Sequence, residues 1–293
     1  MIKVSFVILH FGDIGVTCQC IESILNMEEQ EKISIVLVDN DEKLQETYKK
    51  WDNYSAKNNI FILKMQKKLG FSEANNKGYQ YAIDKIHPEF IVLCNNDIIF
   101  TQKDFVSILE NCYDKEGFDL LGPEIRKTLT GEHQNPMDSR IRTYWEAWQT
   151  VFYNRLALLL YPLIYSFLLK HQNKRNGIQE EKSAINNDYY LHKHENIVLC
   201  GACLIFSKKF IRAEKKAFDP ETQFYYEEYV LTLRCQQKQY KILYDPSLKV
   251  LHGTGAATET AYQEQKIRLK KQMKNIIQSC KIYKKYLRNV IKK

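Results

Sequence analysis

Short, mainly apolar runs recur along the first hundred residues, and each run ends in polar residues or a turn. These runs cover residues 4–9, 33–38, 60–63 and 90–93. Runs of this length between turn signals are typical of buried strands. Apolar residues at helical spacing follow the strands, within residues 16–27, 42–51 and 73–86. The alternation predicts βαβ units around a mainly parallel sheet, and therefore an α/β fold.

The middle of the chain departs from this alternation. Residues 141–195 include Trp145, Trp148, an apolar run at 156–169 and a polar stretch from residue 170 onward. The apolar run is shorter than the roughly 20 residues that a membrane-spanning helix requires, and a proline interrupts it. It predicts either an element that docks on a membrane surface or a helical pair packed on the sheet, inserted into a domain that covers residues 1–258.

The C-terminal segment, residues 259–293, carries the positive charge. Lys and Arg contribute +11 within residues 266–293, which contain no Asp or Glu, so the net charge of +8 leaves 8 − 11 = −3 for the rest. Apolar residues recur there at steps of three and four, and they are Leu269, Met273, Ile276, Ile277, Cys280, Tyr283, Leu287, Val290 and Ile291. This pattern predicts a basic amphipathic helix that suits an anionic membrane surface. The alternative is a helix that packs on the domain with its lysines in solvent. A nucleic-acid partner is not expected, because no recognition fold or stacking platform accompanies the charge.

Eight cysteines are scattered along the chain, which passes from Met1 directly into a strand without a secretory leader. A reducing, cytoplasmic location is therefore expected. Cys200 and Cys203 have the spacing of a metal or redox pair, and Cys18 with Cys20 could complete a zinc site. However, residues 197–206 have the composition of one continuous buried strand, and free cysteine is usually buried.

Polar residues follow two of the predicted strands. Asp39 ends the second strand, and Asn95, Asn96 and Asp97 follow the fourth. In an open α/β sheet, ligands bind just beyond the carboxyl ends of the strands. A carboxylate at that place can hold Mg²⁺ or Mn²⁺ and, through it, a phosphate.

Eight segments along residues 3–255 occur in a characteristic order, and they are 4–11, 35–40, 69–78, 92–98, 201–206, 218–220, 224–228 and 250–253. The series resembles a family 2 glycosyltransferase with the GT-A fold, and is most similar to the rhamnosyltransferase-type enzymes that build bacterial surface polysaccharides. The resemblance implies a central mixed sheet flanked by helices, with the C-terminal helix as an extension. It also implies a nucleotide-diphospho-sugar as donor.

The resemblance implies that Asp39 contacts the nucleotide base, although Asp is also common in turns and caps without any ligand. It places Gly70, Phe71 and Asn75 at the nucleoside pocket, where glycine permits close backbone approach. The alternative for this segment is a plain junction between a loop and a helix.

The triplet at residues 95–97 matches the family's D-x-D position, with Asn95 in place of the first Asp. The resemblance implies that Asn95 binds the ribose and that Asp97 holds Mg²⁺ or Mn²⁺. Because a site with one carboxylate binds such a cation mostly through substrate phosphates and waters, we expect metal to bind with the nucleotide and not before it. His252 is a further candidate, either as a metal ligand or as a structural residue.

Inverting transfer requires a general base that takes the proton of the acceptor hydroxyl. The family places this base at the second acid of a pair that follows an aromatic stretch, which corresponds here to Glu228, with Glu227 as the fallback. Glu replaces the family's Asp and lengthens the side chain by one methylene. The alternative is a solvated acidic pair without a catalytic role.

These features favour an inverting glycosyltransferase that acts on a saccharide acceptor, linked to a lipid, at the cytoplasmic face of the cell membrane. A second hypothesis is a Rossmann-type oxidoreductase, but the glycines of residues 253–255 lack the third glycine of that motif. A third is a non-catalytic module that binds membrane surfaces through a degenerate transferase fold.

Overall fold

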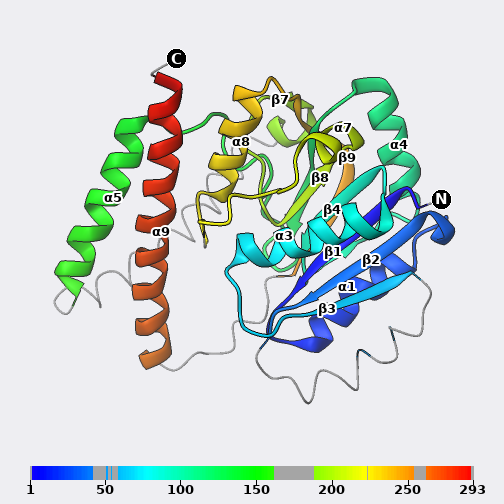
Figure 1. Ribbon diagram of the computed structural model, residues 1–293, viewed down its shortest axis with the longest axis horizontal. Coiled ribbons are helices and arrows are strands. Elements are labelled where there is room, and N and C mark those ends of the chain that lie inside the picture. The colour runs from blue at the N-terminus through cyan, green and yellow to red at the C-terminus, as the bar shows by residue number, and fades with distance from the viewer. Residues whose placement is uncertain are drawn as a thin grey trace.

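The computed structural model describes residues 2–41, 51, 54, 59–161, 188–222, 224–253 and 262–291. Within these residues, nine strands form one mixed sheet in the order β3-β2-β1-β4-β8-β6-β9-β5, with β7 paired to β9 (Figure 1). The strands are β1 (Val4–His10), β2 (Ile33–Asp39), β3 (Ile60–Lys64), β4 (Phe90–Asn95), β5 (Ile98–Phe100), β6 (Leu120–Lys127), β7 (His194–Glu195), β8 (Cys203–Phe206) and β9 (Ile242–His252).

The helices of the described residues connect these strands or follow them. They are α1 (Ile14–Leu25), α3 (Phe71–Tyr81), α4 (Phe105–Glu116), α5 (Tyr144–Leu159), α7 (Lys208–Ala213), α8 (Glu227–Gln237) and α9 (Tyr262–Ile291), with short helical turns η1 (Gln30–Lys32), η2 (Ala82–Ile86) and η3 (Tyr189–Leu191). The predicted α/β fold with a mixed sheet flanked by helices is confirmed. Of the helix predicted at residues 42–51, residues 42–50 lie outside the described residues.

Strand β1 shows why the sheet is covered on both faces. Every one of its residues is buried, and successive side chains point to opposite faces. Phe6 and Ile8 pack in the same core as residues of α1 and α4. Val7 and Leu9 pack with α3, α7 and α8 on the other face. A sheet buried on both faces requires the near-continuous apolar strands that the sequence contains.

The strand register brings polar residues together at one edge of the sheet. β1 pairs in parallel with β2 and with β4, so that His10 lies opposite Asp39 and Leu9 opposite Asn95. On the other side of β4, β8 runs antiparallel. β5 runs antiparallel to β9 and pairs Ile98 with His252. Residues at the ends of β2, β4 and β9, and in the turn that leads from β4 into β5, can therefore take part in one site.

The prediction of one continuous buried strand over residues 197–206 is wrong. Only Cys203–Phe206 form β8, because Gly201 and Ala202 make a turn. The N–H of Cys200 donates to the Oδ1 atom of Asn135 (3.0 Å) and therefore does not take part in strand pairing. The thiols are free, and burial raises the pKa of Cys200 to about 12. No group of three or more His, Cys, Asp or Glu side chains in the described part of the chain could hold a metal ion.

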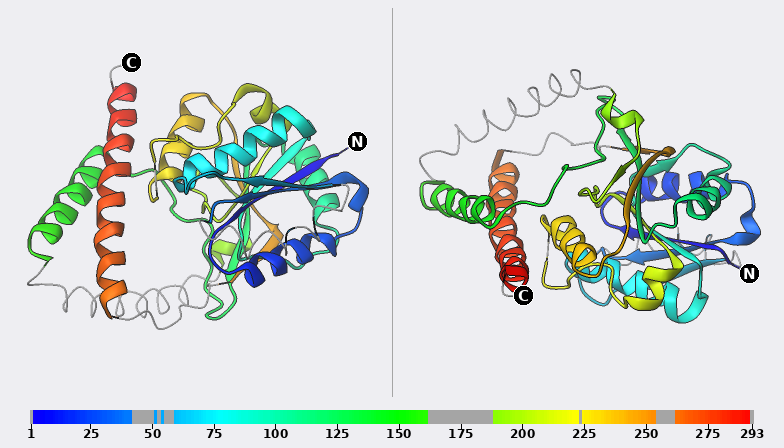
Figure 2. Two further views of the ribbon diagram at one scale, coloured as in Figure 1. Left: turned by 60° about the horizontal axis from the view of Figure 1, so that its bottom comes forward. Right: turned by 90° about the horizontal axis from the view of Figure 1, so that it is seen from above.

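Helices α5 and α9 lie side by side, beyond α8 as seen from the sheet (Figures 1 and 2). A capping box formed by Thr143 and Glu146 begins α5. The core that joins the helices is apolar and aromatic, and it includes Ala147, Val151, Tyr226, Tyr229, Val230, Leu233, Ile277, Cys280, Tyr283 and Leu287. Of the helical pair predicted within residues 141–195, the described residues contain α5, which pairs with α9 of the tail and packs with α8. Residues 162–187 of the predicted insertion lie outside the described residues. The predicted boundary between the main domain and the tail, at residue 258, also lies outside them.

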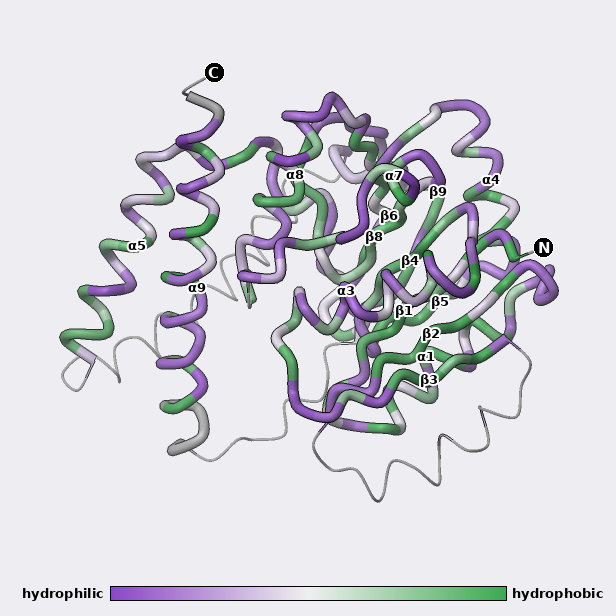
Figure 3. Tube along the Cα trace, viewed as in Figure 1, coloured by the Kyte–Doolittle hydropathy of each residue, from purple (hydrophilic) through white to green (hydrophobic). Residues whose placement is uncertain are grey.

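The predicted amphipathic helix in the tail is α9, and its apolar stripe is covered by protein. Met273, Ile277, Cys280, Tyr283 and Leu287 are all buried. Figure 3 shows the resulting alternation of apolar and polar residues along α9, in contrast to the largely apolar strands. The stripe is therefore unavailable for insertion into a membrane, as the packing alternative predicted. None of the helices in the described ranges is long and apolar enough to cross a membrane.

Candidate active site

Asp39 lies at the carboxyl end of β2, as predicted, and only 1% of it is exposed. Its Oδ2 atom accepts a hydrogen bond from the indole of Trp51 (3.2 Å), and Oδ1 accepts one from the N–H of Asp41 (3.4 Å). The side chain is thus fixed at the sheet edge. The next residue, Asn40, both donates to and accepts from the backbone of Leu69, which fastens the following loop to this edge.

That loop leads into α3 through the predicted nucleoside segment. Gly70 is the residue that precedes the helix, and Phe71 begins it. The ring of Phe71 packs between Phe218 and Phe224, with centroids 5.7 and 5.4 Å away. The amide of Asn75 is buried and donates to the carbonyl of Phe71 (3.0 Å). The structure therefore assigns Asn75 a local helix contact, while Gly70 and Phe71 lie between β2 and the segments that carry residues 218–224.

The side chains of residues 95–97 differ in whether they bond to the surrounding protein. Asn96 donates to the hydroxyl of Thr17 (2.8 Å) and so anchors the turn to α1. The backbone N–H of Asn95 donates to the carbonyl of Ala202 (2.9 Å). The side chain of Asn95 makes no hydrogen bond to another described residue and is half-buried. Asn95 and Asp97 are thus the members of the triplet that a ligand can reach.

Asp97 and His252 meet across the pairing of β5 with β9. Oδ1 of Asp97 lies 3.0 Å from Nε2 of His252, and both side chains are largely buried. Nδ1 of His252 lies 2.6 Å from Oε1 of Gln134. An amide oxygen only accepts, so this contact is a hydrogen bond in the tautomer with the proton on Nδ1, and in that tautomer Nε2 faces the carboxylate with a lone pair.

Two acceptors that face each other in this way require a cation, either a proton on Nε2 or a metal ion bound by both. The separation of 3.0 Å is that of two adjacent ligands of an octahedral ion with bonds of about 2.1 Å. A carboxylate oxygen suits both Mg²⁺ and Mn²⁺, whereas the imidazole nitrogen favours the transition metal Mn²⁺ over Mg²⁺. The pair therefore fits the predicted divalent cation, with most of the coordination left to a ligand.

Glu227 and Glu228 begin α8, directly after Tyr225 and Tyr226. These two tyrosines have φ angles of 69° and 65°, a left-handed conformation that strains residues with a side chain and is concentrated at functional sites. Burial, and then repulsion from Glu228, raises the pKa of Glu227 well above its usual range. Burial also raises the pKa of Glu228. The alternative of a solvated acidic pair is therefore wrong.

Glu228 contacts the turn before β8, and this turn also contacts the end of β4. A Cβ atom added to Gly201 would lie 2.8 Å from Oε1 of Glu228, so the carboxylate occupies the space that the missing side chain leaves. The backbone N–H of Gly201 opposes part of the rise in the pKa of Glu228. The next residue, Ala202, accepts from Asn95. The turn at residues 201–202 thus contacts both Glu228 and the end of β4.

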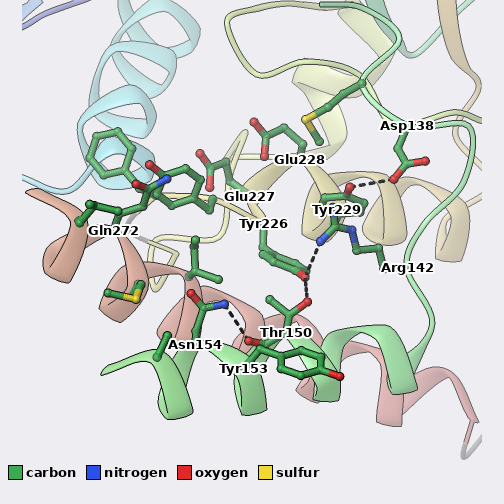
Figure 4. Close-up of a pocket in the computed structure, with 17 residues that line it drawn as sticks. Asp138, Arg142, Thr150, Tyr153, Asn154, Tyr226, Glu227, Glu228, Tyr229 and Gln272 are labelled. Atoms are coloured by element: carbon green, nitrogen blue, oxygen red, sulfur yellow. Dashed lines mark hydrogen bonds between the residues drawn. The ribbon is translucent and has the colours of Figure 1, made fainter. Parts of the chain in front are cut away.

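A cavity of about 1010 Å³ opens between α5, α8 and α9, beside this acidic pair (Figure 4). Its polar and aromatic lining comprises Asp138, Arg142, Thr150, Tyr153, Asn154, Tyr225, Tyr226, Glu227, Glu228, Tyr229 and Gln272. Asp39, Asn95 and Asp97 are not part of this lining. The candidate site therefore has two compartments, one at the sheet edge and one under the helical pair, and Glu228 lies between them.

Several of these residues were not predicted from the sequence. Gln134 orients His252, and Trp51 holds Asp39, but neither belongs to a recognisable motif. Arg142 and Gln272 reach the cavity only because α5 and α9 pack together. The one available signal was the cluster of aromatic residues in the first turns of α5, which marks a surface but not a cavity.

Comparison with known proteins defines the class of this chain. The sequence model of Glycosyl transferase family 2 matches residues 5–174, which is more than half of the 293 residues. The chain therefore belongs to this family and is a glycosyltransferase. This assignment removes the hypothesis of a Rossmann-type oxidoreductase. Comparison with curated proteins gives no match.

Solved structures share the fold at low sequence identity. S. aureus TarS 1-349 in complex with UDP-GlcNAc is 12% identical, with a TM-score of 0.55, and the match covers 94% of this chain and 70% of that one. The mannosyltransferase PcManGT from Pyrobaculum calidifontis, in complex with GDP-Man and Mn²⁺, is 10% identical, with a TM-score of 0.53 and coverage of 96% and 73%. At such identities the likeness shows the fold, which is GT-A, and no more.

Proposed function

We propose that this chain is an inverting glycosyltransferase that moves a sugar from a nucleotide-diphosphate donor to a saccharide hydroxyl. The observation that carries the proposal is the turn at Gly201 and Ala202, because it couples Glu228 to the end of β4. A base at Glu228 lies next to the place where Asp97 would hold the donor diphosphate. TarS and PcManGT, which have the same fold, bind nucleotide sugars, and this supports the choice of donor.

The residues of the chain then have distinct tasks in the reaction. Asp39, Gly70 and Phe71 line the nucleoside side, and Asn95 binds the ribose. Glu228 takes the proton of the acceptor hydroxyl as its oxygen attacks the anomeric carbon and the bond from that carbon to the diphosphate oxygen breaks. Attack from the face opposite the diphosphate inverts the anomeric configuration. Glu227 is the neighbour whose proton keeps the pair from carrying two charges.

Asp97 and His252 would hold Mg²⁺ or Mn²⁺ on the donor diphosphate. The cation, when bound, neutralises the negative charge that develops on the leaving diphosphate. The 3.0 Å contact between the two side chains supports this assignment, as does the Mn²⁺ bound by PcManGT. The transferred sugar would be a hexose or deoxyhexose, and the resemblance to rhamnosyltransferase-type enzymes favours surface polysaccharide as the product.

The test is transfer from a panel of UDP-, GDP- and dTDP-sugars in the presence of Mn²⁺. D97A and E228A should lose at least about 10²-fold in activity. D114A and E28A remove exposed acids on α4 and after α1, and they serve as matched controls that should retain activity. Transfer that survives both D97A and E228A would remove the proposed site, and a chain with no transfer from any donor would be a non-catalytic module.

We also propose peripheral attachment to the inner face of the cell membrane, through α5 and not through the apolar stripe of α9. Trp145, Trp148, Phe152 and Leu159 are between 41% and 78% exposed on α5, and the first three rings form a continuous row. Exposed Trp with neighbouring Lys and Arg is typical of surfaces that bind anionic lipid. Lys284 and Arg288 of α9 supply that charge, because both lie over the ring of Tyr144, the residue before Trp145.

Flotation with vesicles of neutral or anionic lipid tests this attachment. The W145A/W148A variant should bind anionic vesicles about tenfold more weakly than the wild-type chain, because it removes two interfacial rings. The L129A/L191A variant removes exposed apolar side chains from other elements and should bind as the wild type does. Equal binding by both variants would contradict the proposed surface. A membrane-bound enzyme would have ready access to a lipid-linked acceptor.

A further inference from the structure

The cavity under the helical pair contains a cation without an acidic partner. Arg142 lies in the segment just before α5 and is half-buried. Its guanidinium packs on two rings, 4.9 Å from the centroid of Tyr229 and 5.4 Å from that of Tyr226. It donates a hydrogen bond to the hydroxyl of Tyr226 (3.0 Å), which in turn donates to Thr150 (Figure 4), and it also interacts with the hydroxyl of Tyr229.

No carboxylate in the described ranges forms an ion pair with Arg142. Asp138, the nearest candidate on the same wall, instead accepts a hydrogen bond from the hydroxyl of Tyr229 (3.0 Å). A guanidinium has five N–H donors, and a cation removed from water is costly unless it is paired. The unused donors and the unpaired charge together favour an anionic ligand in this cavity.

A second buried group points to a ligand in the same cavity. Glu227 is 5% exposed, and its Oε2 atom has no hydrogen-bond partner among the residues that the structure describes. Burial, and then repulsion from Glu228, raises the pKa of Glu227 and so favours the protonated carboxyl. A protonated Glu227 can donate to a ligand oxygen and does not repel an anion. The wall of the cavity is therefore compatible with a ligand that carries hydroxyl groups and a negative charge.

We propose that the acceptor saccharide carries an anionic group, a phosphate or a carboxylate, which Arg142 binds while the attacking hydroxyl lies at Glu228. This inference rests on the proposed function and names the chemical class of its acceptor. Both anions present two oxygens to a planar guanidinium, so Arg is suited to either of them. The rings of Tyr226 and Tyr229 hold the guanidinium in place before the acceptor arrives, which lowers the cost of binding.

Three matched sets of acceptors test the proposal, with the donor that the panel identifies. They are octyl glycosides of common hexoses, their 6-phosphates and the corresponding uronic acids. The wild-type enzyme should show a KM for a charged acceptor about 10- to 100-fold below that of its neutral counterpart. R142Q should remove this preference by raising the KM of the charged acceptor, with little change in kcat. R142K should give an intermediate KM, because it keeps the charge but loses the planar fork.

Two controls separate this proposal from its alternatives. R155Q removes an exposed arginine of α5 outside the cavity lining and should behave as the wild type. Hydrolysis of the donor by R142Q at the wild-type rate shows that the variant is folded and that the donor compartment is intact. A neutral acceptor used as well as the charged ones, or a charge preference that R142Q retains, would overturn the proposal and leave the transferase function standing. Absence of transfer and of donor hydrolysis in the wild type would instead overturn the proposed function.

Discussion

Oδ1 of Asp97 and Nε2 of His252 lie 3.0 Å apart, although the two residues are distant in the sequence. The antiparallel pairing of β5 with β9 sets this distance, because it places Ile98 opposite His252 and lets the N–H of Gly253 donate to the carbonyl of Asp97 (2.6 Å). Backbone hydrogen bonds thus bring together the two side chains proposed to hold the metal. Its orientation, however, depends on a third side chain, Gln134.

Gln134 fixes the tautomer of His252, and we expect its loss to weaken metal binding. Q134L removes the acceptor for Nδ1–H. The ring of His252 is then no longer held with the lone pair of Nε2 in a fixed direction. The apparent affinity for Mn²⁺ should fall about 10- to 100-fold, as measured by the Mn²⁺ dependence of transfer. Q134E keeps the acceptor and should restore most of the affinity. An unchanged Mn²⁺ dependence in Q134L would show that His252 is not a ligand.

Because Asn95 stands in place of a second carboxylate, the order in which the metal and the nucleotide bind can be tested. With one carboxylate in the proposed ligand set, Mn²⁺ should bind at least about tenfold more tightly in the presence of the nucleoside diphosphate than in its absence. Electron paramagnetic resonance of free Mn²⁺ measures both affinities. N95D adds a second carboxylate and should raise the affinity in the absence of nucleotide. Equal affinities with and without nucleotide in the wild-type chain would contradict this order.

The end of the sheet was predictable because it follows from local pattern. Buried parallel strands are continuous apolar runs, and their polar ends, at Asp39 and Asn95, converge whenever the strands are neighbours. Glu228 was predicted from its place after an aromatic stretch, through the resemblance to a family. For the strand ends the necessary information is local, whereas for Glu228 it lies in the order of eight segments along residues 3–255.

The cavity was not predictable, because it depends on which helices pack together. The apolar stripe of α9 is compatible with a membrane, a partner or its own domain, and periodicity cannot distinguish them. Tertiary contacts decide what covers the stripe, and one of them is that of Cys280 with the carbonyl of Ala147 (3.1 Å). The turn at Gly201 was not predicted either, because the apolar residues on both sides of it suggested one strand. Arg142 and Gln272 acquire their positions only from these contacts.

Gly201 is expected to control the position of Glu228. Its backbone conformation permits alanine, but the added Cβ would lie 2.8 Å from Oε1 of Glu228 and would displace the carboxylate. G201A should therefore fold normally and lose about 10- to 100-fold in kcat, because a small misplacement of the base is costly.

The double variant G201A/E228D separates this steric effect from other causes. Aspartate is shorter by one methylene and leaves room for the Cβ atom. The double variant should be no less active than either single variant, which is a non-additive result. Strictly additive losses in kcat would show that Gly201 and Glu228 act independently.

The pH dependence of transfer should identify the base. Because the pKa of Glu228 is raised, its basic form is lost as the pH falls through a value above that of an ordinary carboxyl group. We therefore expect an acid limb of kcat/KM that lies above the usual range of a glutamate. E228Q should lose about 10²- to 10⁴-fold in kcat. E227Q should retain transfer within about tenfold, and the reverse ranking of the two variants would make Glu227 the base.

Glu227 should lower the stability of the fold at neutral pH, since its carboxyl group is buried with an unpartnered oxygen. Its folded-state pKa is raised above the unfolded value, so its contribution to stability is complete below the unfolded pKa and is lost as the pH rises toward the folded pKa. E227Q mimics the protonated form and should raise Tm at pH 7.5 by about 2–4 °C, which corresponds to roughly 1 kcal/mol. The difference should vanish near pH 4, where the wild-type carboxyl is protonated in both states. Thermal melts of E227Q and of E28Q, an exposed control, measure this effect. A Tm difference that does not change with pH would mean that E227Q acts through packing and not through the proton.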